Sequence, residues 1–301
     1  MEEEEQHKEN FLKKIYRTQY KKLLLIPVLL LVLAIFQIGM QVVTTGDFLN
    51  KGVSLKGGLT VSVETDADVI ELQSYLSNKF SEGDVSVRTL SKTGTQIGVI
   101  IEASDVDVDE ILNALEEKLG IAKEEYSVEV MGSSLGASFF KETFRALILA
   151  FIFMGIVVFI YFRMPIPSLA VILSAFSDII VTLAIVNLMG MKLSTAGIAA
   201  FLMLIGYSVD TNILLSTRAL KRKEGELLDR IYSAMKTGFT MTTTTIIAVV
   251  VALIFAQSEV LKQIMTILII GLLVDLVNTW IQNAGILRWY LDRKRKKHEE
   301  I

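Results

Sequence analysis

The sequence lacks the residue types that build most metal and redox sites. Its 301 residues include no cysteine, so the chain can form neither a disulfide nor a thiolate metal site. Histidine is nearly absent as well, because the only two, His7 and His298, lie in the charged ends of the chain. We therefore expect no metal, no cofactor and no histidine-based catalysis within the fold, and no nucleic-acid partner.

Charged residues are also missing from long stretches of the chain, which is 52% hydrophobic. The apolar residues gather in runs of about 20, the length that lets a helix cross roughly 30 Å of hydrocarbon. We interpret the first run as a retained membrane anchor, because it is too long for a cleaved signal sequence. The last five runs are joined by short connections and predict a bundle over 143–287. The pattern predicts six transmembrane helices, at 23–43, 143–162, 168–189, 194–217, 238–257 and 263–287.

Lysine and arginine in the short loops lie almost entirely on one side of the predicted membrane. They gather in segment 1–22, in the loop after the fourth run and in the tail 288–301, whereas the opposite short loops hold only Lys192 and Lys262. Basic loops stay in the cytoplasm, so we expect a multi-pass protein of the cell membrane with both termini cytoplasmic. The basic loops are expected to contact the head groups of membrane lipids.

The segment 44–142, between the first and second runs, is polar and long enough for a small domain. It holds 18 acidic and 8 basic residues, and the charge rule places it outside the cytoplasm. Alternating apolar and polar residues predict four strands, at 59–64, 85–88, 96–101 and 126–130. Helical spacing predicts two helices, at 66–80 and 106–119. The order β-α-β-β-α-β is that of a ferredoxin-like α+β domain.

Three aspartates, Asp178, Asp210 and Asp275, each stand alone within an apolar run. A carboxylate at the bilayer centre costs roughly 2.5–3.5 kcal/mol, so such residues usually face a protein interior or a water path. One hypothesis is a carboxylate cluster between helices that binds and releases protons. The other is that these groups only hydrogen-bond helices together. Arg218 lies about 12 Å along the helix from Asp210, and we expect it to reach the cytoplasmic interface.

Two features near Asp210 suggest contacts with neighbouring helices. Gly206, with Gly197 nine residues earlier, is expected to let another backbone approach closely. A run of threonines at 240–245 is predicted to open the fifth span. Its hydroxyls can bond to backbone carbonyls or reach the Asp210 carboxylate.

The one-plus-five order, the large insertion and two motifs resemble the SecF branch of the SecD/SecF family, protein-export membrane proteins related to the resistance-nodulation-division transporters. The resemblance covers nearly the whole chain, and Asp178 stands where the family has an aspartate in its third span. Asp210-Thr211 stands where bacterial members usually read Asn-Asp, which is similar to the archaeal branch. The motifs are Leu55-Lys56-Gly57-Gly58 and Gly206-Tyr207-Ser208-Val209-Asp210.

The resemblance implies a non-enzymatic accessory subunit of the Sec export machinery. Such a subunit pairs with SecD as a pseudo-twofold twelve-span unit beside the Sec translocation channel, and its outer domain contacts the translocating polypeptide. The proton motive force would drive movement of that domain. The candidates for proton binding or helix coupling are Asp178, Asp210, Asp275 and Arg218. The motif positions are Gly57, Gly58, Gly206, Tyr207, Ser208 and Thr211.

Three alternative functions stay open at this point. The first is a transporter of lipids or other amphiphiles from the same superfamily, although the outer domain is small for that class. The second is a scaffold in which the aspartates only hold SecD. The third is an intramembrane aspartyl protease using Asp178 and Asp210, although Val209 stands where those enzymes carry a glycine before the aspartate.

Overall fold

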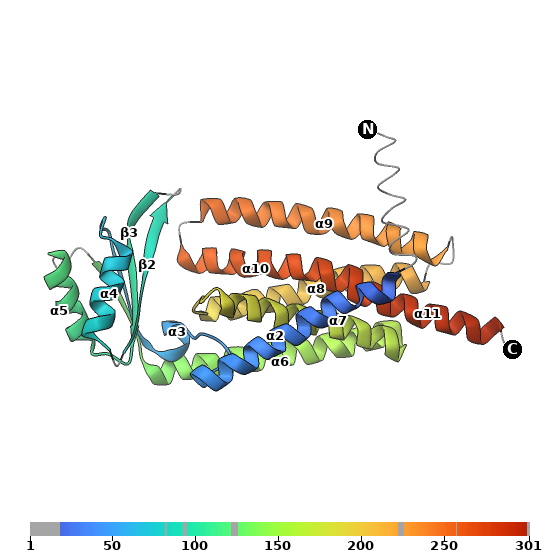
Figure 1. Cartoon of the computed structure of the whole chain (residues 1–301), viewed down its shortest axis with the longest axis horizontal. Helices are drawn as coiled ribbons and strands as arrows, with labels where there is room; N and C mark the ends of the chain where they lie inside the picture. Colours follow the sequence, from blue (N-terminus) through green and yellow to red (C-terminus); the bar gives the residue numbers. More distant parts are fainter. Residues whose placement is uncertain are drawn as a thin grey trace.

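The computed structural model describes residues 19–299 apart from 82, 93–94, 122–125, 222–225 and 257. His7 and the basic residues at 13–17 and 222–223 that entered the orientation argument lie outside this part of the chain. Within it, six helices are long and apolar enough to cross a membrane, and they run along one axis of the molecule (Figure 1). They are α2 (Leu25–Thr45), α6 (Ser133–Phe162), α7 (Pro165–Leu188), α8 (Thr195–Lys221), α9 (Leu227–Phe255) and α10 (Glu259–Val277), the last continued by η1 (Asn278–Asn283) and α11 (Ala284–Glu299).

Two of these helices begin about ten residues before the apolar runs that predicted them. The first turns of α6 pack against the connection to the outer domain. The first turns of α9 pack Leu227, Leu228 and Ile231 against a cluster that includes Trp280. An apolar run marks only the part of a helix that is long and hydrophobic enough to cross the membrane. The first turns of α6 and α9 pack against other parts of the protein, so the apolar runs did not predict them. The threonine run at 240–245 therefore lies within α9 and does not open it.

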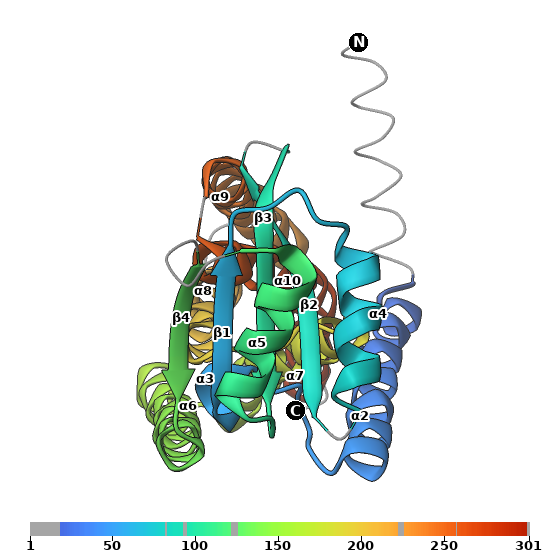
Figure 2. The ribbon, with the colours of Figure 1, turned by 90° about the vertical axis from the view of Figure 1, so that its left-hand side faces the viewer.

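A four-stranded antiparallel sheet with two helices forms a separate layer at one end of the bundle (Figures 1 and 2). Its strand order is β2-β3-β1-β4. This topology, between the first membrane helix and the other five, confirms the predicted ferredoxin-like α+β domain. The elements are β1 (Gly58–Val63), α4 (Val69–Lys79), β2 (Asp84–Lys92), β3 (Thr95–Ser104), α5 (Val108–Leu119) and β4 (Tyr126–Met131).

The two faces of this sheet differ in polarity because its side chains alternate. On β1, Leu59, Val61 and Val63 are fully buried against α4 and α5, which cover the face away from the bundle (Figure 2). Thr60 and Ser62, between them, face the bundle and line a cavity there. The outer domain therefore presents a hydrophilic surface to the end of the membrane helices.

Close backbone contacts join the outer domain to the bundle through α3 (Val53–Lys56). Gly52 N donates to Leu193 O over 2.8 Å, in the loop between α7 and α8. Gly57 has φ +92°, and a Cβ there would lie 2.4 Å from Ser133 Cα at the start of α6. A Cβ on Gly58 would lie 2.1 Å from Ala103 O on β3. Only glycines fit at both motif positions, since the neighbouring backbones leave no room for a side chain.

Candidate functional site

Polar side chains follow one face of α7, of α8 and of α10 with its continuation η1. On each helix they recur three or four residues apart, the spacing that aligns side chains on a single face. All of them are buried, and the three helices contact one another pairwise. Polar faces therefore meet at the centre of an apolar bundle. The residues are Ser174, Ser177 and Asp178 on α7, Ser208, Thr211 and Asn212 on α8, and Asp275, Asn278, Thr279 and Gln282 on α10 and η1.

Asp178 is the point where all three helices are linked. Its carboxyl group is fully buried. Ser208 Oγ of α8 donates to Oδ2 over 2.5 Å, and Asn278 Nδ2 of η1 donates to Oδ1 over 2.8 Å. Removing this carboxyl group would leave two buried donors on two other helices without their acceptor.

Asp275 lies beside Asp178, near enough for the two carboxyl groups to interact electrostatically. Thr279 Oγ1, one turn further along, donates to Asp275 Oδ1 over 2.8 Å. Thr211 Oγ1 of α8 lies 3.1 Å and 3.2 Å from its two oxygens. We call Asp178 and Asp275 the carboxyl pair.

Amide side chains form a further layer around the carboxyl pair. Asn212 Nδ2 donates to Ser208 O over 2.7 Å, and Asn283 Nδ2 donates to Asn212 Oδ1 over 2.6 Å. Gln282 Nε2 donates to Ser177 Oγ over 3.2 Å. The side-chain oxygens of Asn278, Gln282 and Asn283 accept no hydrogen bond from described residues. The cluster thus has unused acceptors next to its two acids.

The helix that carries Asp275 widens into a π-helix directly after it, at η1. A π-helix holds more residues per turn than an α-helix, and such segments are frequent at functional sites. Here it supplies Asn278, Gln282 and Asn283 to the cluster. Trp280, on the same segment, is buried against α9, where a Cβ on Gly238 would lie 2.1 Å from its ring.

Within the described chain, no ion pair joins the carboxyl pair to a lysine or arginine. Arg218, which we expected to reach the membrane interface, donates from Nη1 to the backbone carbonyl and the hydroxyl of Ser233 in α9. It fastens α8 to α9 and forms no ion pair with an aspartate among the described residues.

Asp210, a leading candidate from the sequence, does not join the cluster. It is exposed, because it lies two residues from Ser208 and hence about 200° around α8 from the face that meets Asp178. Gly206 shares the exposed side, and no atom of the described residues lies within 4 Å of a Cβ placed there, so none of them packs closely against Gly206. Tyr207 is the motif residue that reaches α9, where its hydroxyl donates to Thr245 Oγ1 over 3.0 Å.

The threonine run of α9 mostly bonds to its own helix. Thr240, Thr244 and Thr245 donate to backbone carbonyls three or four residues earlier. Of the two roles expected for this run, carbonyl bonding is therefore the one observed. None of the hydrogen bonds between described residues connects it to Asp210.

Sequence reasoning missed several members of the cluster, notably Ser177, Thr279 and Gln282. A signal for them existed, since Thr279 and Gln282 lie four and seven residues after Asp275, and Ser177 lies directly before Asp178. Polar residues recur at helical spacing on the helix faces that carry Asp178 and Asp275. In the span of Asp210 they recur on a different face from Asp210, and this difference would have distinguished Asp210 from the other two aspartates.

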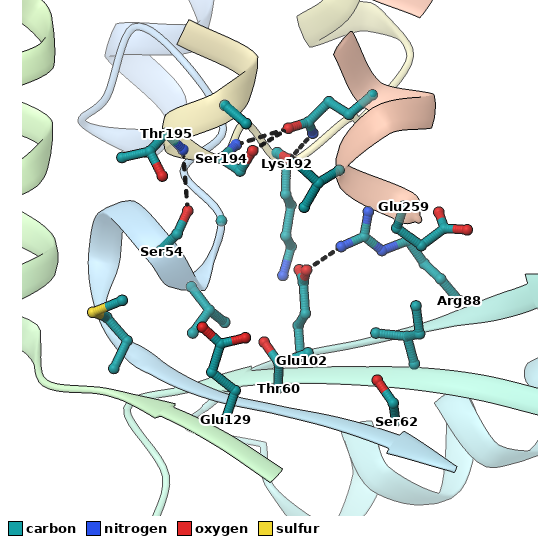
Figure 3. A pocket seen from close by; sticks show the side chains of 17 residues that line it. Ser54, Thr60, Ser62, Arg88, Glu102, Glu129, Lys192, Ser194, Thr195 and Glu259 are labelled. Carbon is teal, nitrogen blue, oxygen red and sulfur yellow. Dashed lines mark hydrogen bonds and ion pairs between the residues drawn. The ribbon is translucent and has the colours of Figure 1, made fainter. Parts of the chain in front are cut away.

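A second polar region lies between the sheet and the end of the bundle, as a cavity of about 320 Å³ (Figure 3). Arg88 and Glu102 form an ion pair on its sheet side. On its bundle side, Gln263 of α10 accepts hydrogen bonds from the backbone N and the hydroxyl of Ser194, and donates to Lys192 O over 2.7 Å. Gln263 thus holds the loop that leads into α8.

Known proteins resemble the chain over nearly its whole length. The family described as "Protein export membrane protein SecD/SecF, C-terminal" matches residues 111–293. The protein-export membrane protein SecF of Pyrococcus furiosus is 41% identical over 288 residues, 95% of this chain and 96% of that protein. SecF of Methanocaldococcus jannaschii is 40% identical over 288 residues, 92% of this chain and 98% of that protein.

A solved structure shares the fold. It is SecDF, a translocon-associated membrane protein from Thermus thermophilus, and it matches with a TM-score of 0.69 at 16% sequence identity. The match covers 91% of this chain and 38% of that one. At this identity the likeness concerns the architecture alone.

The burial difference between the aspartates predicts different effects on stability. Asp178→Ala should lower the free energy of unfolding by about 2–5 kcal/mol, because it leaves the Ser208 and Asn278 donors unpaired at about 1–3 kcal/mol each. Asp210→Ala, as the matched control on an exposed face, should change it by less than about 0.5 kcal/mol. Denaturant titration of the purified chain in micelles measures both, and equal effects would contradict the placement of these residues.

Proposed function

The chain belongs to the SecD/SecF family of protein-export membrane proteins, and we propose that its carboxyl pair links proton movement to its work in export. The family's function is that of a multi-pass accessory subunit acting with SecD and the Sec machinery, and it is not enzymatic. The relatives are archaeal, in agreement with the branch predicted from Asp210-Thr211. The observation that carries the proton proposal is the proximity of two buried acids that no ion pair joins to a lysine or arginine in the described part of the chain.

The physical reason is that the carboxyl pair is poorly suited to carry two negative charges. Like charges in contact repel each other strongly in a low-dielectric interior, and no cation among the described residues offsets them. The pair is therefore expected to hold at least one proton. Gain or loss of a proton changes which atoms donate and which accept, so the hydrogen bonds with Ser208, Thr211 and Asn278 must rearrange.

Such a rearrangement would reach the outer domain through α8 and α10, the helices that supply most of the cluster. Gln263 lies twelve residues before Asp275 on α10, about 18 Å along the helix. It is hydrogen-bonded to Ser194 in the loop before α8. At the start of α8, Thr195 N donates to Ser54 Oγ over 3.2 Å (Figure 3). Ser54 belongs to α3, which leads directly into β1. A shift between α8 and α10 would thereby tilt the sheet.

SecD is the partner that we propose for the face carrying Asp210. Met203, Gly206 and Asp210 lie three or four residues apart on one side of α8, and Met203 is 47% exposed. A carboxylate facing lipid at this depth costs roughly 2.5–3.5 kcal/mol, which a covering helix would relieve. The open surface at Gly206 allows a close backbone approach. In this proposal Asp210 acts at the contact with SecD and not within the carboxyl pair.

We further propose that both termini lie in the cytoplasm and that residues 44–142 lie outside, where they meet the translocating polypeptide. The support is the distribution of lysine and arginine, which are concentrated at the end of the molecule opposite the α+β domain. The same basic segments are suited to contact anionic lipids of the cytoplasmic leaflet.

A scaffold role is the second candidate, because the hydrogen bonds of Asp178 also hold three helices together without any proton exchange. Replacement by asparagine separates the two functions. The amide keeps nearly the same shape and still accepts hydrogen bonds, but it does not take up a proton at physiological pH.

Asp178→Asn and Asp275→Asn should each abolish the stimulation of export by a proton gradient while leaving the basal rate and SecD copurification unchanged. The measurement is export of a secreted reporter from vesicles that contain SecD and this chain, over a range of imposed gradients. The matched control is Asp229→Asn, an exposed aspartate in the first turn of α9. Normal gradient stimulation in both cluster variants would reject proton coupling and leave the scaffold role.

The proposed route to the outer domain can be tested at the α3–α8 contact that transmits the movement. Ser54→Ala removes the hydroxyl that accepts from Thr195 N, so it should weaken gradient stimulation while leaving the basal export rate unchanged. The control is Ser62→Ala, which removes a hydroxyl from β1 within the domain. Equal gradient stimulation of the two variants in the vesicle assay would show that the α3–α8 contact does not carry the movement.

A further inference from the structure

Three lysines line a hollow of about 360 Å³ beside the end of α2 that is nearer the α+β domain. Thr45, the last residue of α2, and Gly190, just after the end of α7, also border it. The hollow therefore lies where two membrane helices end, which is the level of lipid head groups. The lysines are Lys51, Lys56 and Lys192.

Two aspartates, Asp47 and Asp84, line the hollow beside the three lysines, so its lining carries more cations than anions. Segment 44–142 holds 18 acidic and 8 basic residues, and two of those eight, Lys51 and Lys56, border the hollow. Lys192 comes from the separate loop between α7 and α8. Cations from two distant parts of the sequence thus converge on one site in an otherwise acidic region.

The ion pairs of these lysines leave capacity for another anion. Lys51 pairs with Asp47 over 2.6 Å, Lys56 with Asp105 over 2.8 Å, and Lys192 with Asp84 over 2.8 Å. The three aspartate side chains are 46%, 67% and 45% exposed, in that order. Exposed pairs of this kind are weak, and each ammonium group has three protons to donate. An incoming anion can therefore bind without the loss of a strong interaction.

Exposed apolar side chains come one or two positions before two residues that border the hollow, Thr45 and Gly190. Val43 near the end of α2 is 87% exposed, and Leu188 and Met189 at the end of α7 are 73% and 57% exposed. Cations at the helix ends next to uncovered apolar surface complement a molecule with an anionic head and a hydrocarbon tail. A free anion would leave the apolar part of this surface uncovered.

We propose that this hollow binds the phosphodiester head group of an anionic membrane lipid, in the leaflet on the side of the α+β domain. Lys51, Lys56 and Lys192 contact the phosphate, and the lipid chains lie along the ends of α2 and α7. Because Lys56 belongs to α3 and Lys192 to the loop before α8, a bound lipid also fastens the outer domain to the bundle. The site does not depend on the carboxyl pair.

The test is lipid binding to the full chain by native mass spectrometry, with phosphatidylglycerol compared with phosphatidylcholine. We expect preferential binding of phosphatidylglycerol, weakened about thirtyfold in Lys51→Gln/Lys192→Gln, since each lysine near a membrane surface contributes about a fivefold change in affinity. The matched control is Lys79→Gln/Lys118→Gln, which removes two ion-paired lysines on α4 and α5 and should leave binding unchanged.

Three results would overturn the proposal. The first is equal binding of the two lipids, and the second is that the control variant loses as much phosphatidylglycerol binding as Lys51→Gln/Lys192→Gln. The third is displacement of phosphatidylglycerol by soluble glycerol phosphate at comparable concentration, which would indicate a site for free phosphate esters. The single variants Lys51→Gln and Lys192→Gln, each expected to weaken binding about fivefold, test the same point if the double variant does not fold.

Discussion

Two buried acids that lie side by side constrain the centre of the bundle. Asp178 and Asp275 lie in an interior where an unpaired polar group is costly, so each must receive hydrogen bonds from other positions in the bundle. Ser208 and Asn278 donate hydrogen bonds to Asp178, and Thr211 and Thr279 donate hydrogen bonds to Asp275. These bonds fix how α7, α8 and α10 are rotated about their axes, which apolar packing specifies only loosely. The orientation of Asp210 toward the outside follows from the same rotation.

Local patterns predicted the fold because its elements are specified locally. Runs of about 20 apolar residues, strands with alternating polarity and helix caps depend on neighbours within a few positions. Asp68, for example, accepts from the backbone N of Ile70 and Glu71 and begins α4. The family motifs added the topology and the partner. Helix ends were less predictable, since the first turns of α6 and α9 depend on contacts with distant segments.

The site was only partly predictable, since it depends on which side of each helix a residue occupies. All three aspartates interrupt apolar runs in the same way, yet two lie inside the bundle and one lies outside. The π-helix at η1, which brings Asn278 and Gln282 to the cluster, has no simple sequence pattern. Gly206 indicated close packing, but no described part of this chain lies against it. The glycine at position 57 did indicate a close contact within the chain, because the backbone of Ser133 leaves no space there for a side chain.

The central claim is that the carboxyl pair holds an exchangeable proton within the membrane. Infrared difference spectroscopy of the full chain in lipid vesicles tests it most directly, because a protonated carboxyl group has its own carbonyl band. The account predicts a band that shifts in deuterated water and disappears or moves in both Asp178→Asn and Asp275→Asn, but persists in Asp210→Asn. A spectrum with no such band, or one that depends on Asp210 alone, would contradict it.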